Sequence, residues 1–299
     1  MKRKIVGWFL ILSVVYAFSG CKSCNKEAAN QDVNVEVDNE IVNDINQAKK
    51  IFYSLPSPLE TAMLIKTAGA TYNEKLLNPL SNVSSYTTNK SMALNLGIYT
   101  TDLSFASLFD QTQTSINYMQ AAKKMADGLG ILDAIDNNTI QKLEENINNR
   151  DVIMDIISET FMSSSSFLKE NDRTAVASVV LVGGWVEGLY IATQLVDVNN
   201  FKHTKLVERI VDQKLSFDIV LKLLDENKDN ADVSSLIAEM NDLKKIFDKI
   251  EIKTSKIEAV PDPKTNVTTL KSQSKISITP LVFKELTDKV KNIRNNFVL

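Results

Sequence analysis

The feature that most constrains this chain is an apolar run without proline, AVASVVLVGGWVEGLYIATQL, at Ala175–Leu195. Its large apolar residues occupy every side of a helix rather than one stripe. A surface helix keeps such residues on one face, so this pattern predicts a helix that is buried over most of its circumference. The Asn171-Asp172 pair before the run supplies side-chain oxygens that can cap its first turn.

Three glycines lie in the middle of this run, at Gly183, Gly184 and Gly188. Each lowers helix propensity by about 1 kcal/mol relative to alanine. Their presence inside an apolar helix therefore predicts that a neighbouring element approaches its backbone closely. Glu187 lies one turn from the first two glycines and one turn from Tyr190, so its carboxylate falls on this crowded face. A membrane span is disfavoured, because that carboxylate lies near the middle and no comparable second run follows.

A second interior helix is predicted over 90–111, with the sequence KSMALNLGIYTTDLSFASLFDQ. One stripe on this segment, at spacings of three and four residues, places a carboxylate among apolar side chains. A second apolar stripe on another face predicts that this helix also lies inside the protein. The first stripe comprises Leu94, Ile98, Asp102, Phe105 and Phe109.

Most other segments repeat apolar residues with a helical period. Ser57-Pro58-Leu59-Glu60 has the pattern of a capping box, with proline at the first helical position. Residues 70–89 predict a long loop, and 253–277 predict a loop with at most a small hairpin. The predicted fold class is all-α: a multi-helix bundle with two buried central helices, long loops and at most a minor β-hairpin. Further helices are expected over 40–54, 57–69, 115–126, 140–147, 151–168, 206–211, 217–224, 233–250 and 280–297.

The first 20 residues are organised like a secretory signal peptide. Lys2-Arg3-Lys4 gives a charged start, an apolar stretch covers 5–18, and Ser19-Gly20 precede a cysteine. The polar segment that follows has too few large apolar groups to offset the entropy lost on ordering. The expected organisation is a signal peptide over 1–20, a flexible tether over 21–39 and an all-helical domain over 40–299.

The segment Phe18-Ser19-Gly20-Cys21 resembles the lipobox of bacterial lipoproteins, with phenylalanine where leucine is typical. The resemblance implies that Cys21 is acylated, with chains such as palmitate, and becomes the first residue of the mature protein. Several acyl chains hold a protein stably on a membrane. The implied location is the cell envelope, at the outer membrane, facing either the periplasm or the cell surface. An ordinary secretory signal and an uncleaved anchor helix are the alternatives.

Charge and cysteine content restrict the partners and the cross-links. Removing residues 1–20 takes away three of the 34 basic residues and none of the 37 acidic ones, which leaves a formal net charge of about −6. That balance argues against binding to nucleic acid or to anionic lipid head groups. Cys24 is the only cysteine besides Cys21, so no disulfide is expected within the domain.

Three stretches carry a further resemblance: SPLETAMLIKTAGATY at 57–72, LNLGIYTTDLSFASLFDQ at 94–111 and VGGWVEGLYIATQL at 182–195. Together they resemble an uncharacterised family of lipoproteins from Bacteroidota-type bacteria. The resemblance spans about residues 45–200. It implies no activity and transfers no catalytic residue to this chain.

The chain lacks the residue sets of the commonest catalytic and metal sites. Its single histidine, His203, lies in a charged segment, which argues against multi-histidine metal sites and Ser-His-Asp catalysis. No glycine-rich phosphate-binding loop is present. The serine run Ser163–Ser166 is expected to provide small residues at a helix contact. No catalytic residue, metal ligand or cofactor is therefore assigned.

Two carboxylates on apolar helix faces remain as candidates for a site. A lone buried carboxylate is costly, so each must be protonated, paired or hydrogen-bonded, with Lys66 or Lys90 among the possible partners. If the two central helices pack together, the carboxylates converge. They could then form an internal network that fixes helix register, a binding pocket, or an acid/base pair as in glycoside hydrolysis. The candidate binding pocket comprises Asp102, Glu187, Tyr99, Tyr190 and Trp185.

These features favour a lipid-anchored, non-enzymatic binding or scaffold module of the cell envelope. A carboxylate-dependent hydrolase is one alternative, and it predicts a cleft that contains both acids. An apolar-ligand or lipid carrier with a pocket near Asp102 and Glu187 is the other alternative. The membrane, reached through Cys21, is the one partner expected. Neither a protein partner nor a small-molecule partner is specified by the sequence.

Overall fold

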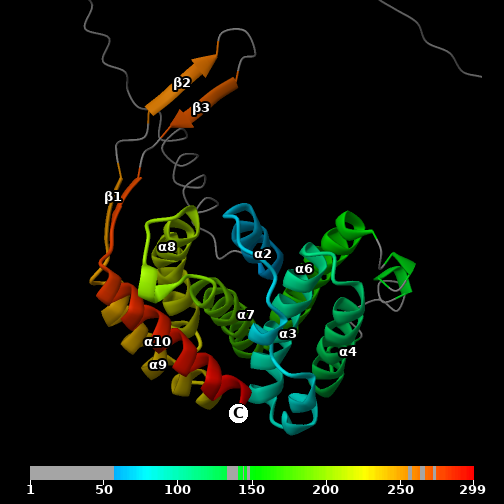
Figure 1. Cartoon of the computed structure of the whole chain (residues 1–299). Coiled ribbons are helices and arrows are strands. Elements are labelled where there is room, and N and C mark those ends of the chain that lie inside the picture. The colour runs from blue at the N-terminus through cyan, green and yellow to red at the C-terminus, as the bar shows by residue number, and fades with distance from the viewer. Residues whose placement is uncertain are drawn as a thin grey trace, which may run out of the picture. The chain divides into compact units, whose positions relative to one another are not determined.

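Helices form most of the regular structure in the computed structural model of this chain (Figure 1). The residues described fall in one compact unit. The predicted signal peptide, Cys21, the tether and the predicted helix over 40–54 lie outside them, as do parts of 140–147. The described residues are 57–132, 141–143, 145–146, 149–254, 258–262, 267–271 and 274–299.

The order of helices confirms the all-α prediction. The segments predicted at 206–211 and 217–224 form one continuous helix, because the residues between them include neither glycine nor proline. Short 3-10 helices lie in the loops, at η1 (Glu74–Leu76), η2 (Leu80–Ser85) and η4 (Val198–Asn200). The α-helices are α2 (Pro58–Thr67), α3 (Asn89–Leu108), α4 (Thr112–Gly128), α6 (Arg150–Glu170), α7 (Thr174–Gln194), α8 (Lys205–Asp225), α9 (Ala231–Phe247) and α10 (Pro280–Val298).

A β-hairpin joins α9 to α10, in the segment predicted to be a loop with at most a small hairpin (Figure 1). Strand β1 (Glu251–Thr254) pairs antiparallel with β4 (Ser274–Ser277). Strand β2 (Glu258–Asp262) pairs antiparallel with β3 (Val267–Lys271). The four strands thus form two separate two-stranded sheets, and the second pair lies between the strands of the first along the chain.

Helices α3 and α7 lie at the centre of the helical body. Helix α3 packs against α2, α4, α6, α7 and α10, and α7 packs against α2, α3, α6, α8, α9 and α10. Neighbours on several sides explain why neither helix keeps a polar face. The prediction of two buried central helices is confirmed, since most side chains of both are buried.

Glycines allow the backbones of α3 and α7 to touch. A Cβ atom on Gly97 would lie 2.1 Å from the carbonyl oxygen of Val180, and one on Gly183 would lie 2.2 Å from that of Leu94. Both distances are far below an ordinary van der Waals contact. The predicted close approach to α7 is therefore confirmed, and the neighbour is α3, which contributes a glycine of its own.

Helix α7 also has the length and composition of a membrane span, and it is the one helix among the described residues that does. In this structure, 83% of its most apolar window is buried inside the protein. A core helix surrounded by other helices has the same properties, so this finding is weak evidence for a span.

Of the N-terminal caps predicted for α2 and α7, the first is confirmed and the second is wrong. The Glu60 N–H donates to the Ser57 hydroxyl at 3.2 Å and the Ser57 N–H donates to the Glu60 carboxylate at 2.7 Å, so the capping box of α2 is confirmed. The expectation that Asn171-Asp172 caps α7 is wrong. Asn171 donates back to the Phe167 carbonyl at 2.8 Å and Asp172 has a φ of 56°, so this pair ends α6 instead.

The loop between α2 and α3 covers the core. Tyr72 stacks on Phe105 of α3 with ring centroids 5.5 Å apart. Tyr86 is buried at the far end of the loop. Tyr72 and Tyr86 therefore both pack on the core.

Candidate functional site

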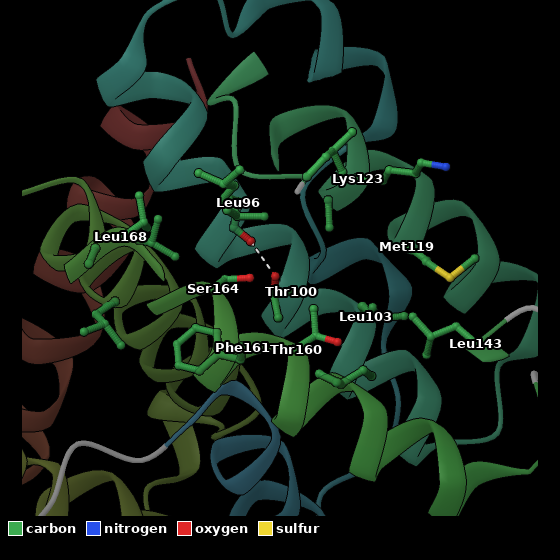
Figure 2. Close-up of a pocket in the computed structure, with 17 residues that line it drawn as sticks. Leu96, Thr100, Leu103, Met119, Lys123, Leu143, Thr160, Phe161, Ser164 and Leu168 are labelled. Atoms are coloured by element: carbon green, nitrogen blue, oxygen red, sulfur yellow. Dashed lines mark hydrogen bonds between the residues drawn. The ribbon is translucent and has the colours of Figure 1, made fainter. Parts of the chain in front are cut away.

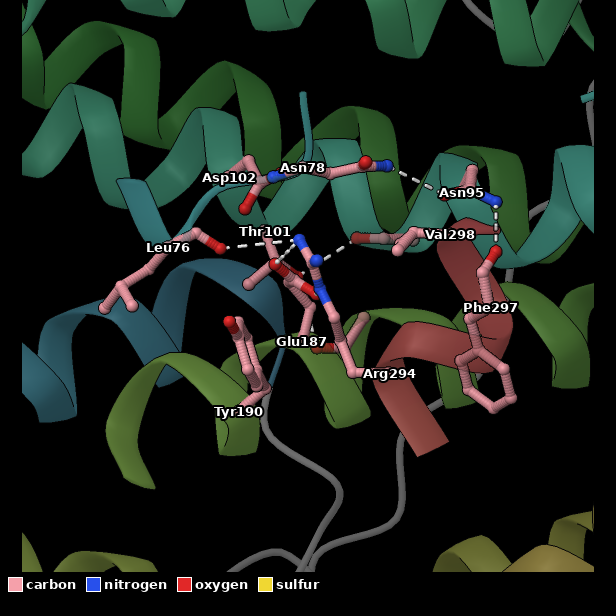
Figure 3. Close-up of polar contacts among 12 residues, drawn as sticks. Leu76, Asn78, Asn95, Thr101, Asp102, Glu187, Tyr190, Arg294, Phe297 and Val298 are labelled. Atoms are coloured by element: carbon pink, nitrogen blue, oxygen red, sulfur yellow. Dashed lines mark hydrogen bonds and ion pairs between the residues drawn. The ribbon is translucent and has the colours of Figure 1, made fainter. Parts of the chain in front are cut away.

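A buried ion pair joins the central helix α7 to the C-terminal helix α10 (Figure 3). Arg294 donates from Nε to one carboxylate oxygen of Glu187 at 2.9 Å and from Nη2 to the other at 3.1 Å. The Glu187 side chain has no exposed surface and the Arg294 side chain is 7% exposed. Two parallel bonds of this kind make the strongest common contact between a guanidinium and a carboxylate. Each charge is therefore compensated inside the protein.

Other groups enclose the guanidinium of Arg294. It lies over the ring of Tyr190, 4.7 Å from the centroid, and its Nη2 also donates to the Leu76 carbonyl at 3.4 Å. Burial disfavours the charged form of Arg294, but the negative charge of Glu187 more than offsets this effect, so the pKa of Arg294 is raised. The side chain is consequently a permanent cation in the folded protein.

Asp102 of α3 lies next to this pair and is also fully buried. One of its carboxyl oxygens accepts a bond from the Asn78 backbone N–H at 3.0 Å, and the other has no hydrogen-bond partner among the described residues. Burial raises the pKa of Asp102 well above its usual value, and the negative charge of Glu187 raises it further. The two carboxyl groups are within hydrogen-bonding reach. We infer that Asp102 is protonated and donates toward Glu187.

Replacing Asp102 with asparagine is expected to remove a pH dependence of stability. The pKa of Asp102 is higher in the folded protein than in the unfolded chain. The folded state therefore keeps a proton that the unfolded state releases. Between the pKa of Asp102 in the unfolded chain and its pKa in the folded protein, the free energy of unfolding falls as pH rises, by at most about 1.4 kcal/mol per pH unit. Asparagine keeps an acceptor for Asn78 and gives Glu187 a permanent donor. The variant's gain in stability over the parent should therefore grow with pH.

Urea unfolding of a protein that comprises residues 40–299, at about pH 5 and about pH 8, measures this change. The matched control is Asp229→Asn, which removes one exposed carboxylate. A stability difference for Asp102→Asn that stays the same at both pH values would contradict a protonated Asp102.

The loop before α3 also ties the end of α10 to α3. The side-chain amide of Asn78 donates to Asn95 at 2.9 Å and to the Tyr86 hydroxyl at 3.1 Å. Asn95 donates to the Phe297 carbonyl at 2.9 Å (Figure 3). Tyr86 donates to the Val298 carbonyl at 3.1 Å. The last carbonyls of a helix have no partner within the helix. Here, side chains from α3 and the loop supply those partners.

The structure brings together most of the residues predicted to share a site. Asp102, Glu187 and Tyr190 adjoin Arg294. Tyr99 is buried nearby and donates to the Pro79 carbonyl at 3.2 Å. Burial raises the pKa of Tyr99, and the neighbouring Tyr86 and Asp102 raise it further.

Trp185 faces away from this cluster. It lies two residues from Glu187 on α7, a rotation of about 200° around the helix axis. Its ring stacks on Phe217 of α8 with centroids 5.2 Å apart, and its N–H donates to Ser216 at 3.3 Å. Trp185 therefore belongs to an aromatic contact with α8 and α9 rather than to the polar cluster.

The cation that meets Glu187 is neither of the two lysines named from the sequence. Lys66 donates to the backbone carbonyl of Leu108, and Lys90 donates to the hydroxyl of Ser235. Both lysines are therefore engaged on other parts of the protein.

A signal for Arg294 was present in the sequence. Arg294 lies four residues from Val290 and four from Val298, so it falls on the buried side of the last helix. A basic residue inside an apolar stripe is the counterpart of the pattern that singled out Asp102. The same reasoning, applied to α10, would have marked it.

An apolar cavity lies between α3, α4, α6 and α7 (Figure 2). Its volume, measured as the space open to the centres of water-sized groups, is about 90 Å³. Thirteen of its 17 lining residues are apolar, and Lys123 is the only charged one. Helix α3 contributes Leu96, Thr100 and Leu103, which lie at least about 100° around the helix from Asp102. Neither Asp102 nor Glu187 lines this cavity.

No group of three or more His, Cys, Asp or Glu side chains within the described ranges could hold a metal ion. Comparison of the chain with protein families, with characterised proteins and with solved structures found no match. The polar cluster and the apolar cavity are therefore the observations from which function is inferred.

Proposed function

We propose that this chain is a non-enzymatic binding module of the bacterial cell envelope, held at the membrane by lipid on Cys21. In this proposal, the cavity between α3, α4, α6 and α7 accommodates the apolar part of a small ligand. The observation that carries the proposal is the cavity lining, in which thirteen of 17 residues are apolar. Such a lining with a few polar groups is typical of small-molecule sites.

The polar cluster supports a structural role better than hydrolysis. Glycoside hydrolysis requires two carboxyl groups on either side of a bond that the substrate brings into the site. Asp102 and Glu187 are fully buried, and both oxygens of Glu187 accept bonds from Arg294. This arrangement favours a network that fixes the register of α3, α7 and α10.

The cavity volume limits the size of the ligand. One water-sized group needs about 10–15 Å³ of such space. A volume of about 90 Å³ therefore accommodates about six to nine groups. This size suits an alkyl chain of about that many carbons and excludes a complete phospholipid.

A series of 1-alkanols from hexanol to undecanol tests the proposal by calorimetric titration of the mature chain. Each CH₂ that enters the cavity contributes about 0.8 kcal/mol, which is about fourfold in affinity. Affinity is expected to rise by that factor per carbon until the cavity is full, near about nine carbons, and then to level off.

Two variants in the serine run provide the matched comparison. Ser164 lines the cavity, so Ser164→Phe should fill it and weaken nonanol binding by about tenfold or more. Ser166 is exposed, so Ser166→Phe adds the same ring to the same helix outside the cavity. Equal binding by the two variants, or no alkanol binding to the parent protein, would overturn the proposal.

A further inference from the structure

We propose that the ligand of this cavity carries an anionic group at one end of its alkyl chain, and that Lys123 meets that group at the cavity mouth. This inference rests on the proposed function, because it names the ligand class of the same site. A medium-chain carboxylate such as decanoate, with about nine carbons beyond its carboxyl group, fits the cavity by the volume argument above.

Lys123 is placed to bridge the apolar cavity and the solvent. It is the only charged residue in the lining, yet its side chain is exposed on α4. A lysine in this position lines a cavity with its methylene groups and keeps its ammonium in water. In Figure 2 its Nζ extends away from the other lining side chains. A carboxylate next to this ammonium would leave the attached alkyl chain inside the cavity.

Several lining residues near Lys123 are partly exposed. Ala122 of α4 and Thr160, Phe161 and Ser164 of α6 are half-buried. Ala177 and Val180 of α7 are buried, whereas Leu181 of α7 and Thr100 of α3 are half-buried. Partly exposed lining residues therefore lie on α4 and α6, and Lys123 is on the first of these helices.

Among the described residues, the ammonium of Lys123 has no acidic partner. None of the ion pairs within the described ranges includes it. Lysines on other helices pair with an acidic residue four positions on, as Lys244 does with Asp248 and Lys284 with Asp288. Asp127 is four positions after Lys123, but the two form no ion pair in this structure.

The test compares decanoate with decanol, which share the alkyl chain and differ in charge at about pH 8. Lys123→Gln is expected to weaken decanoate binding about two- to fivefold, the range of an exposed ion pair, and to leave decanol binding unchanged. Lys124→Gln removes the next lysine, which does not line the cavity, and is expected to change neither affinity. Raising salt to about 1 M should abolish the difference between the two variants.

The outcomes separate this inference from the proposed function. If decanol binds and Ser164→Phe blocks it, but decanoate binds Lys123→Gln and Lys124→Gln equally well, the inference fails and the binding function stands. A parent protein that binds decanol but not decanoate also overturns the inference. If neither compound binds the parent protein, or if Ser164→Phe binds both as the parent does, the proposed function itself fails.

Discussion

Replacing Arg294 with alanine is expected to destabilise the fold by about 3–5 kcal/mol, because it leaves a buried carboxylate without its counter-charge. That carboxylate, on Glu187, has no exposed surface, and both of its oxygens accept bonds from the guanidinium. The expected loss is a large part of the 5–15 kcal/mol that typically stabilises a folded domain. Urea unfolding of a protein that comprises residues 40–299, followed by circular dichroism, measures this loss.

Two further variants separate the effect of charge from the effect of packing. Glu187→Leu combined with Arg294→Met removes both charges at similar volume, and is expected to recover most of the loss. Arg209→Ala breaks an exposed ion pair with Asp212, at 3.0 Å, and should cost about 1 kcal/mol or less. If Arg294→Ala were as stable as Arg209→Ala, or if the double variant were less stable than Arg294→Ala, the ion pair would not have the proposed role.

Replacing Gly97 or Gly183 with alanine is expected to lower the free energy of unfolding by about 3 kcal/mol or more. This is the upper end of the range for an overpacked core. The added Cβ atoms would lie 2.1 Å and 2.2 Å from backbone carbonyl oxygens of the opposite helix. A side chain can rotate away from such a contact, but the backbone of a helix cannot, so α3 and α7 would have to separate. The better helix propensity of alanine offsets only about 1 kcal/mol of this cost.

Gly184 provides the matched control, because it is the next residue on the same helix. A Cβ atom there would have its nearest neighbour at 3.3 Å, so Gly184→Ala should change stability by about 1 kcal/mol or less. The thermal unfolding midpoint reports the difference: about 3 kcal/mol corresponds to roughly 6–12 °C for a domain of this size. Equal midpoints for Gly183→Ala and Gly184→Ala would contradict the close crossing.

Local patterns predicted those parts of the fold that depend on residues a few positions apart. The apolar residues around Ala175–Leu195 required a buried helix, and its glycines required a close neighbour. The capping box of α2 was also readable, because Ser57 and Glu60 bond to each other's backbone. The prediction that Asn171-Asp172 caps α7 was wrong, because polar residues between two helices can either end the first helix or start the second.

The candidate site was only partly predictable for a geometric reason. Asp102 and Glu187 each stood out as a carboxylate within an apolar stripe, and the structure places the two together. Trp185 was grouped with them, although two positions of separation put it on the opposite side of α7. Two residues on the same helix therefore do not necessarily belong to the same cluster.

By itself, the sequence determined that this protein is helical, that two of its helices are buried, and that α7 has a close neighbour, because each follows from the composition of a single segment. Only the tertiary structure decided that Gly97 lies against Val180 and Gly184 of α7, and that Arg294 pairs with Glu187 across 107 positions of the chain. It also decided where the cavity lies. A cavity is the volume that side chains of four helices leave unfilled, and no one of those helices carries a signal for it.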